Sequence, residues 1–477
     1  GEFLYASGKI EYLDKLVSSM QPSEIVFQKN KRADYNALFS DKYYSFAIDD
    51  WAFQEDFAKE KLLGHFGTNS LKGFGVNDLN EGIVAAGAIL HYLNDNHQKK
   101  LQHIRSIKRI EEDSFVWMDR FTIRNLELVQ SPNEDAITLI DVIDKTLSPM
   151  GARLLKRWVL LPLKDAKKIN ARLDFVDALF KKKQERTLLN EHLNDVGDLE
   201  RLVSKVSVQR VNPRELIKLK ETLNCIPLIK EVLSKIENKE TKSMSRALNP
   251  CKKLSQTIEK HLLESPAVQV GKGPVINNGL NKELDSLREI LSDGKSYLDK
   301  MQQKEMTRTG ISSLKISFNN VFGYYFEVRN THKDKVPEEW IRKQTLVNAE
   351  RYITEELKEY EHKILGAEDK IRALETRLFN ELVEIVSEHI GPIQKNAFLL
   401  AKLDCFCAFA GISEQYNYSK PIINNSLEIN IKNGRHPVIE KSIPAAESYI
   451  PNDVFLDEKT QQIMMITGPN MSGKSAL

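Results

Sequence analysis

A glycine-rich loop near the C-terminal end of the sequence constrains the fold most, because it requires a particular backbone around it. The apolar run at 461–467 leads directly into the loop, as a buried strand would. Glycines let backbone N–H groups point at phosphate oxygens, a lysine can reach the β- and γ-phosphates, and a serine hydroxyl can coordinate magnesium. The loop consists of Gly468, Pro469, Asn470, Met471, Ser472, Gly473, Lys474 and Ser475. Strand and loop together predict an ATP or GTP site, and the alternative is a glycine-rich turn that binds nothing.

Length and composition predict a multidomain protein. The 477 residues correspond to about three or four domains of ordinary size. The formal net charge is only +2, so a DNA-binding surface would have to come from local clusters of Lys and Arg. We expect no apolar stretch of membrane-spanning length and no N-terminal leader, and therefore a cytoplasmic protein without a membrane partner.

The cysteines and histidines predict no zinc site. No two cysteines form a C-x-x-C pair, and the histidines form no spaced cluster. Cys405 and Cys407 lie in an apolar helical run at 399–410 and are expected to be buried.

The first part of the chain, to about residue 110, predicts a small α/β domain with a strand at 24–27 and a helix at 81–94. A helical pattern then extends from about 117 to 290. Ser148-Pro149 predicts the start of one helix, and the sequence Asn212-Pro213-Arg214-Glu215 predicts the start of another.

A β insertion interrupts the helical pattern at 296–354. Residues 314–319 and 324–329 alternate between apolar and polar side chains, which predicts a hairpin with one polar face. The region carries many Lys and Arg side chains, with Asn, Gln and Thr, which suit binding to the phosphate backbone of DNA. Acidic residues occur here too, so a solvated charged face explains the composition equally well.

Residues 350–390 predict one long helix that ends at Gly391-Pro392 and extends about 60 Å. We expect it to join the β insertion to the nucleotide loop as a lever. The alternative is an ordinary helical core element.

Several segments, in the same order along the chain, resemble the MutS family of DNA mismatch-repair proteins. The glycine-rich loop and residues 434–438 resemble its ATPase domain, and residues 344–352 resemble the end of its clamp. Residues 66–76 resemble its connector domain, and residues 148–158 resemble the start of its lever core. Together these segments span nearly the whole chain.

The resemblance implies a multidomain, mainly α fold with α/β parts. The first domain would be an RNase-H-like α/β connector at 1–112, incomplete at its N-terminus. A long-helix lever core would follow at 113–295 and 355–418, with a β-rich clamp inserted in it at 296–354. Residues 419–477 would form the N-terminal part of a P-loop ATPase domain.

The resemblance also implies a function and its site residues. The family binds mispaired double-stranded DNA as a dimeric clamp, uses ATP and Mg²⁺ for conformational change, and recruits a downstream repair factor. It places ATP on residues 468–475, with magnesium reached through Ser475, and adenine on Tyr449, although a packed surface aromatic is the alternative for that tyrosine. The clamp candidates for DNA contact are Lys315, Asn319, Arg342, Lys343 and Gln344, and strand register decides which of them face DNA.

Two departures limit what we expect of this sequence alone. We expect it to lack the family's Phe-x-Glu mismatch wedge and the acidic magnesium-binding strand beyond the loop. Weak, salt-sensitive DNA binding without mismatch preference, and no ATP turnover, are therefore the expectation. A MutS-type clamp that acts in recombination without mismatch recognition is the alternative function, and an unrelated P-loop ATPase is a more distant one.

Overall fold

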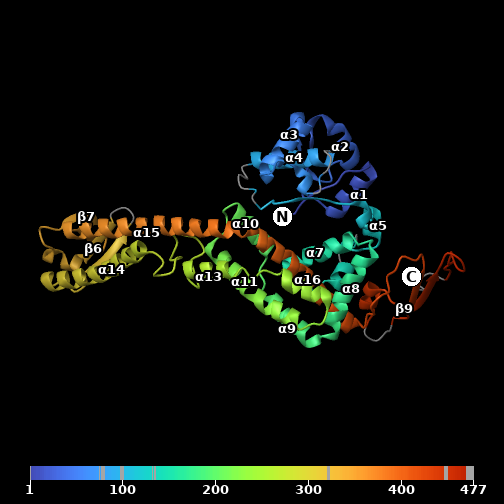
Figure 1. Cartoon of the computed structure of the whole chain (residues 1–477). Helices are drawn as coiled ribbons and strands as arrows, with labels where there is room; N and C mark the ends of the chain where they lie inside the picture. The colour runs from blue at the N-terminus through green and yellow to red at the C-terminus, as the bar shows by residue number, and fades with distance from the viewer. Residues whose placement is uncertain are drawn as a thin grey trace. The chain divides into compact units, whose positions relative to one another are not determined.

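The computed structural model describes residues 2–468 except 75, 77–80, 97–100, 102, 132, 134–135, 320–322 and 445–448 (Figure 1). The chain forms two compact units. The first comprises Gly1–Arg210, Glu221–Lys252 and Ser387–Leu477, and the second comprises Val211–Lys220 and Lys253–Val386. Both units are mostly helical with small sheets, as expected for a multidomain, mainly α protein.

The first unit begins with α/β structure. Strand β1 (Phe3–Tyr5) pairs in parallel with β4 (Ile107–Arg109), and β2 (Glu24–Gln28) pairs in parallel with β3 (Tyr44–Ile48). The associated helices are α1 (Ile10–Met20), η1 (Lys29–Lys31), α2 (Arg32–Phe39), η2 (Asp50–Phe53), α3 (Glu55–Phe66), η3 (Leu71–Phe74) and α4 (Glu81–Asp95). The predicted strand and helix are confirmed as β2 and α4.

Helix α4 packs closely on α3 because it carries Gly87. A Cβ atom at Gly87 would lie 2.5 Å from the Cα atom of Ala58 in α3. A larger residue would therefore force the two helices apart. The glycine that weakens the helical pattern in the sequence is thus a packing residue.

The helical part of the first unit is built around α16 (Ile390–Tyr416), which contacts α7, α8, α9 and α10. The helices here are η4 (Glu112–Ser114), α5 (Arg120–Asn125), α6 (Leu139–Ile143), α7 (Pro149–Leu160), α8 (Ala166–Lys181), α9 (Lys183–Asn194), α10 (Leu199–Ser207) and α12 (Lys239–Ala247). Helix α11 (Pro213–Ser234) has residues in both units. Cys405 and Cys407 are buried in α16, as predicted, with exposures of 0% and 2%.

Contrary to the sequence-based expectation, one described helix is long and apolar enough to cross a membrane. Helix α16 passes that test by length and composition, but 67% of its most apolar window is buried inside the protein. Burial of this kind is typical of a core helix, because its apolar side chains already pack against neighbouring helices.

The two predicted helix starts are confirmed by their caps. The Ser148 hydroxyl accepts the backbone N–H of Gly151 at 3.0 Å at the start of α7. At the start of α11, the Asn212 side chain accepts the N–H of Glu215 and the Glu215 carboxylate accepts the N–H of Asn212, both at 3.0 Å. This reciprocal pair satisfies two N–H groups that the helix itself leaves open.

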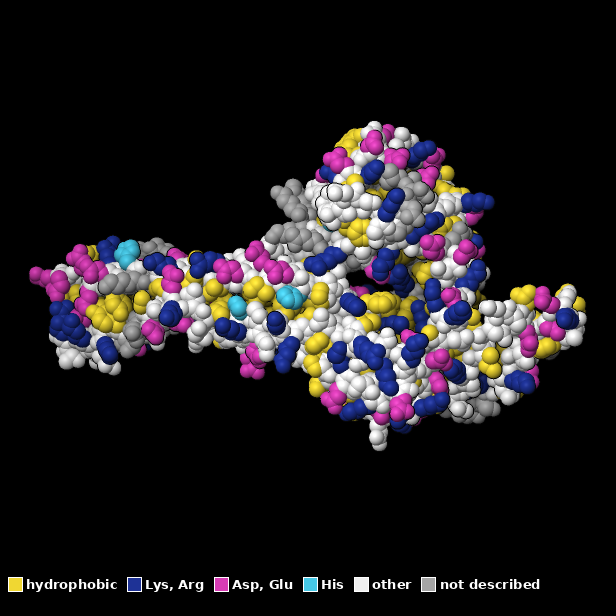
Figure 2. Space-filling model, viewed as in Figure 1, with side chains coloured by type: hydrophobic (Ala, Val, Ile, Leu, Met, Phe, Trp, Pro, Cys, Tyr) yellow, Lys and Arg dark blue, Asp and Glu magenta, His cyan; other side chains and the backbone are white. Residues whose placement is uncertain are grey.

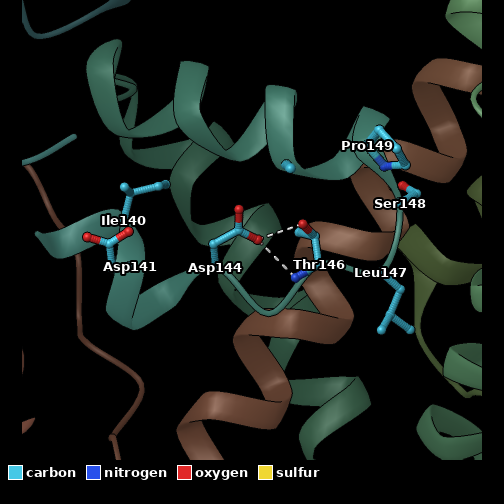
Figure 3. A pocket seen from close by; sticks show the side chains of 8 residues that line it. Ile140, Asp141, Asp144, Thr146, Leu147, Ser148 and Pro149 are labelled. Carbon is cyan, nitrogen blue, oxygen red and sulfur yellow. Dashed lines mark hydrogen bonds between the residues drawn. The ribbon is translucent and has the colours of Figure 1, made fainter. Parts of the chain in front are cut away.

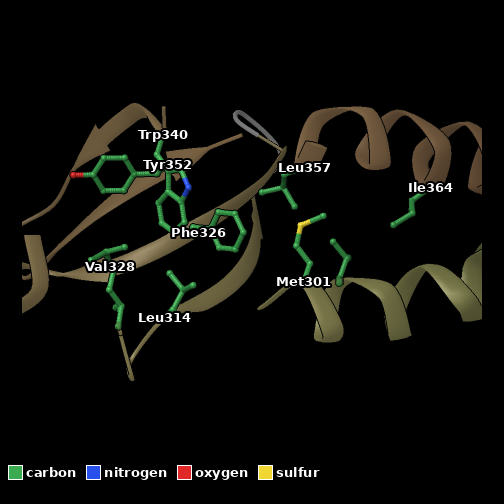
Figure 4. Close-up of a cluster of buried hydrophobic side chains, with 10 residues drawn as sticks. Met301, Leu314, Phe326, Val328, Trp340, Tyr352, Leu357 and Ile364 are labelled. Carbon is green, nitrogen blue, oxygen red and sulfur yellow. The ribbon is translucent and has the colours of Figure 1, made fainter. Parts of the chain in front are cut away.

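The second unit contains α13 (Lys252–His261), α14 (Lys282–Thr309) and a four-stranded antiparallel sheet in the order β5-β6-β8-β7. Its strands are β5 (Lys315–Asn319), β6 (Gly323–Arg329), β7 (Ile341–Thr345) and β8 (Ala349–Ile353), and η5 (Asn330–Lys335) follows β6. A core that includes Phe326, Trp340, Leu357 and Met301 joins the sheet to α14 and to α15 (Glu355–Glu388) (Figure 4). The ring of Trp340 stacks on Phe326 with centroids 4.6 Å apart.

The long helix predicted at 350–390 is observed, but it begins five residues later and ends two residues earlier than predicted. Residues 349–353 form β8, α15 runs from Glu355 to Glu388, and α16 begins at Ile390. Gly391-Pro392 lies inside the first turn of α16 and does not end a helix. Proline is tolerated there because the first N–H groups of a helix have no intrahelical acceptor.

Beyond α16 lie α17 (Pro437–Ser442) and an antiparallel pair of strands, β9 (Ile429–Gly434) and β10 (Asn452–Leu456). The strand predicted at 461–467 is not observed. Ile463 and Met465 are 84% and 86% exposed, and this segment pairs with none of the described strands. A strand requires a hydrogen-bonded neighbour, which the sequence pattern alone does not supply.

Candidate nucleic-acid interface

One face of the sheet in the second unit carries a row of polar side chains. Lys315 pairs with Glu327, Glu327 with Arg351, and Arg351 with Gln344, so one residue of each strand meets in this row. Cross-strand partners share a face of the sheet. We call this surface the polar face and define it by Lys315, Ser317, Asn319, Glu327, Arg329, Gln344 and Arg351.

Arg351 organises the centre of the polar face. Its guanidinium donates to Gln344 Oε1 at 2.7 Å and to Glu327 Oε2 at 3.4 Å. It also lies over the ring of Tyr325, with Cζ 4.5 Å from the centroid. These contacts hold the three side chains in place without any ligand, because the guanidinium of Arg351 is the partner of both the Glu327 carboxylate and the Gln344 amide oxygen.

The outer cations of the polar face are available to a ligand. Lys315 and Arg329 are exposed, and neither forms an ion pair with any residue that the structure describes. A cation without an internal carboxylate can neutralise a phosphate without losing an existing interaction. The polar face therefore presents charge at its edges and fixed hydrogen-bonding groups at its centre.

The opposite face of the sheet packs on the core, yet it holds a carboxylate. Glu350 is 2% exposed, and its carboxylate accepts the hydroxyl of Tyr352 and lies 2.9 Å from Lys333 Nζ and 3.5 Å from Arg342. The Tyr352 hydroxyl and the Lys333 ammonium hold the pKa of Glu350 below its ordinary value. Burial, followed by the hydrogen bond to Glu350, raises the pKa of Tyr352 to about 12.

The register separates the five predicted clamp residues. Lys315, Asn319 and Gln344 lie on the polar face, whereas Arg342 lies opposite Tyr352 on the core face, where it pairs with Glu350. Lys343 is the extra residue at a β-bulge between Arg342 and Gln344. It is exposed and makes no ion pair with a described residue.

The predicted DNA-contact residues left out both arginines of the polar face, Arg329 and Arg351. The alternation placed Arg329 on the polar side of the predicted hairpin, in phase with Tyr325 and Glu327, but it was not chosen as a candidate. Arg351 could not be placed on a strand, because residues 350–353 were interpreted as helix. Lys and Arg side chains are interspersed with Asp and Glu on the face of this unit seen in Figure 2.

The nucleotide end is less fully described. Residues 469–475 of the glycine-rich loop lie outside the described residues, and only Gly468 falls within them. Tyr449 is described and is partly exposed. The predicted ATP and Mg²⁺ contacts of the loop therefore remain sequence predictions.

A hollow of about 530 Å³ lies beside the start of α7 in the first unit, lined by residues of α6, α7 and the turn between them (Figure 3). Asp144 Oδ1 accepts the N–H and the hydroxyl of Thr146, at 3.0 and 2.6 Å. Asp141 Oδ2 similarly accepts the N–H and hydroxyl of Thr138, at 2.9 and 2.6 Å. These carboxylates serve the local turns, and no cluster suited to a metal ion is found among the described residues.

Comparison with known families agrees with this architecture. Residues 1–105 match MutS domain II, and residues 121–410 match MutS domain III. The chain therefore belongs to the MutS family.

Curated relatives match the chain along its whole length. It is 54% identical over 477 residues to the DNA mismatch repair protein MutS of Phocaeicola vulgatus and to that of Flavobacterium johnsoniae, covering 100% of this chain and 55% of each relative. It is 53% identical to the DNA mismatch repair protein MutS of Cytophaga hutchinsonii, covering 56% of that relative. The chain thus spans about half the length of the curated relatives it matches.

Proposed function

We propose that this chain supplies the DNA clamp, the lever and part of the nucleotide site of an ATP-dependent protein that recognises mismatched DNA and initiates repair. The observation that carries the proposal is the 54% identity, across every residue of the chain, to relatives named DNA mismatch repair protein MutS. The recombination alternative gains no support, because the relatives compared above carry the mismatch-repair name.

The polar face supports a role in holding duplex DNA. Lys315 and Arg329 supply phosphate-neutralising charge, and Gln344 and Asn319 supply hydrogen-bonding groups on the same face. Contacts of this type fix the protein on the backbone but carry no sequence information. Discrimination between paired and mispaired bases must therefore come from another part of the assembled protein.

ATP and Mg²⁺ complete the proposal. Backbone N–H groups of 468–473, apart from Pro469, which has none, would cradle the phosphates. Lys474 would reach the β- and γ-phosphates, and Ser475 would face magnesium. Tyr449 offers an aromatic surface for adenine. When bound, the nucleotide would supply the energy that drives conformational change. The full-length protein that carries this chain would then act as a DNA-dependent ATPase. It would work as a dimer in the cytoplasm and would recruit a downstream repair factor.

The test uses the full-length protein that carries this chain. We expect tighter binding to a mismatched duplex than to a matched one, because repair requires that preference. Lys474→Ala should abolish ATP-dependent release from DNA while leaving initial DNA binding nearly unchanged, since the loop and the clamp sheet are separate sites. Equal binding to matched and mismatched duplexes would refute the repair function, and loss of DNA binding in Lys474→Ala would refute separate sites.

A further inference from the structure

A small pocket in the first unit gathers positive charge over aromatic rings. It has a volume of about 240 Å³ and is formed chiefly by α8 and α16. Phe175 and Phe406 are 2% and 1% exposed and lie with ring centroids 4.6 Å apart, which gives the pocket an aromatic wall. Arg172 and Lys402 line it together with Lys168 and Glu240. None of these residues belongs to the polar face or to the glycine-rich loop.

The two inner cations rest on aromatic rings. Arg172 Cζ lies 3.8 Å from the centroid of Trp158, and Lys402 Nζ lies 5.5 Å from that of Phe406. The quadrupole of an aromatic ring attracts a cation but does not neutralise it. Both side chains are thus fixed in position while they keep their charge.

No carboxylate of the described residues lies within ion-pair distance of either cation, although the charge of Glu240 acts on Lys402 from farther away. Neither Arg172 nor Lys402 forms an ion pair or hydrogen bond with any described residue, and Glu240 also lies beyond ion-pair distance. Burial lowers the pKa of Arg172 to about 10, and burial followed by the charge of Arg172 lowers the pKa of Lys402. Two partly buried like charges are unfavourable, and a bound anion would remove that repulsion.

We propose that this pocket binds a small organic oxyanion, a carboxylate or phosphate monoester attached to an apolar or aromatic group. The anion would lie between Arg172 and Lys402, because a planar guanidinium binds oxyanions bidentately and an ammonium adds a point charge. The apolar group would pack on Phe175 and Phe406. The volume is equivalent to about eight water molecules, more than a bare phosphate fills.

Glu240 sets the expected order of affinities. Its negative charge faces the same pocket and repels an anion, whereas Arg172 and Lys402 attract one. Removal of Glu240 should therefore strengthen binding, and removal of Lys402 should weaken it. Opposite effects at two residues of one pocket separate anion binding from general damage to the fold.

The experiment is calorimetric titration of the 477-residue chain with benzoate, phenyl phosphate and the uncharged benzyl alcohol. We expect saturable binding of both anions at one site and no saturable binding of the alcohol. Lys402→Gln should weaken binding by about tenfold or more, Lys402→Arg should restore it, and Glu240→Gln should tighten it. The matched control, Lys395→Gln on the exposed side of α16, should leave affinity unchanged.

Three results would overturn the proposal. The first is absence of saturable anion binding up to about 10 mM, a concentration that detects even weak sites. The second is equal affinity for benzyl alcohol, which would mean an apolar pocket only. The third is loss of binding in Lys474→Ala with no effect of Lys402→Gln, which would place the anion at the glycine-rich loop. The thermal unfolding midpoint of each variant shows whether it is folded.

Discussion

At the scale of single residues, the most consequential contact joins α7 to α16. Asp404 is 1% exposed and accepts the N–H groups of Leu147 and Ser148, at 2.9 and 2.8 Å, and the Ser148 hydroxyl at 2.6 Å. Burial raises the pKa of Asp404, while these hydrogen bonds oppose the rise. Sequence analysis predicted the start of α7 correctly, but not this partner, which lies 256 residues away from Ser148.

Gly151→Ala should destabilise the first unit. A Cβ atom at this position would lie 2.2 Å from Asp404 Oδ2, and the carboxylate is held by three hydrogen bonds that resist displacement. Overpacking of this kind costs about 1–3 kcal/mol. Gly411→Ala in α16 is the matched control, because no atom outside the neighbouring residues and the backbone of its own helix lies within 4 Å of its Cβ position. Urea unfolding should show a lower midpoint for Gly151→Ala and an unchanged or higher one for Gly411→Ala.

Glu350→Gln should make the free energy of unfolding of the second unit depend less on pH. The folded pKa of Glu350 is lowered, so its stabilisation is present above the unfolded pKa and is lost as pH falls through the folded value. At pH 7 the substitution should cost about 1–3 kcal/mol, because Tyr352 loses a charged acceptor. The gap between variant and unsubstituted chain should begin to narrow as pH falls below about 4 and should close only below the folded pKa of Glu350.

Urea unfolding midpoints measured from neutral pH downward would check the Glu350 prediction. The exposed Glu338→Gln serves as control, since that side chain has no buried partner to lose. A gap between Glu350→Gln and the unsubstituted chain that stays constant over the whole acidic range would contradict the proposed carboxylate interaction.

At the scale of elements, sequence patterns correctly predicted the helices and strands whose formation depends on neighbouring residues. The hairpin of β5 and β6 was found from its alternation, and α11 from its cap. The pair β7 and β8 was missed because the bulge at Lys343 interrupts the alternation and because Glu350, a charged residue, faces the core. The end of α15 was predicted to within two residues, but Gly391-Pro392 was interpreted as a stop signal although it lies in the first turn of α16.

Asn212→Ala should weaken α11. The side chain is an N-cap acceptor for Glu215 N–H, and its loss typically costs about 1 kcal/mol. Asn212→Asp keeps an acceptor oxygen and should keep nearly full stability. Hydrogen exchange of the first-turn amides of α11 would report the difference. Equal protection in the alanine and aspartate variants would show that the cap contributes nothing.

At the scale of the whole molecule, the chain combines a glycine-rich sequence motif, a helical core and a β sheet with one polar face, and it forms two compact units. Family membership and the order of these parts could be predicted from the sequence, because several short motifs resemble the MutS family in the same order along the chain. The composition of the polar face that we propose contacts DNA could not, because it depends on the register of four strands and on which cations already have partners. Arg342 illustrates this, since its pairing with Glu350 is invisible in the sequence.

We propose that the polar face holds the phosphate backbone of duplex DNA, and the salt dependence of DNA affinity measures that contact. For this chain, we predict that Lys315→Ala combined with Arg329→Ala reduces the slope of log affinity against log salt concentration by about 2, since each lost phosphate contact contributes about 0.9. Lys395→Ala should leave the slope unchanged. A slope unaltered in the double variant would contradict the account.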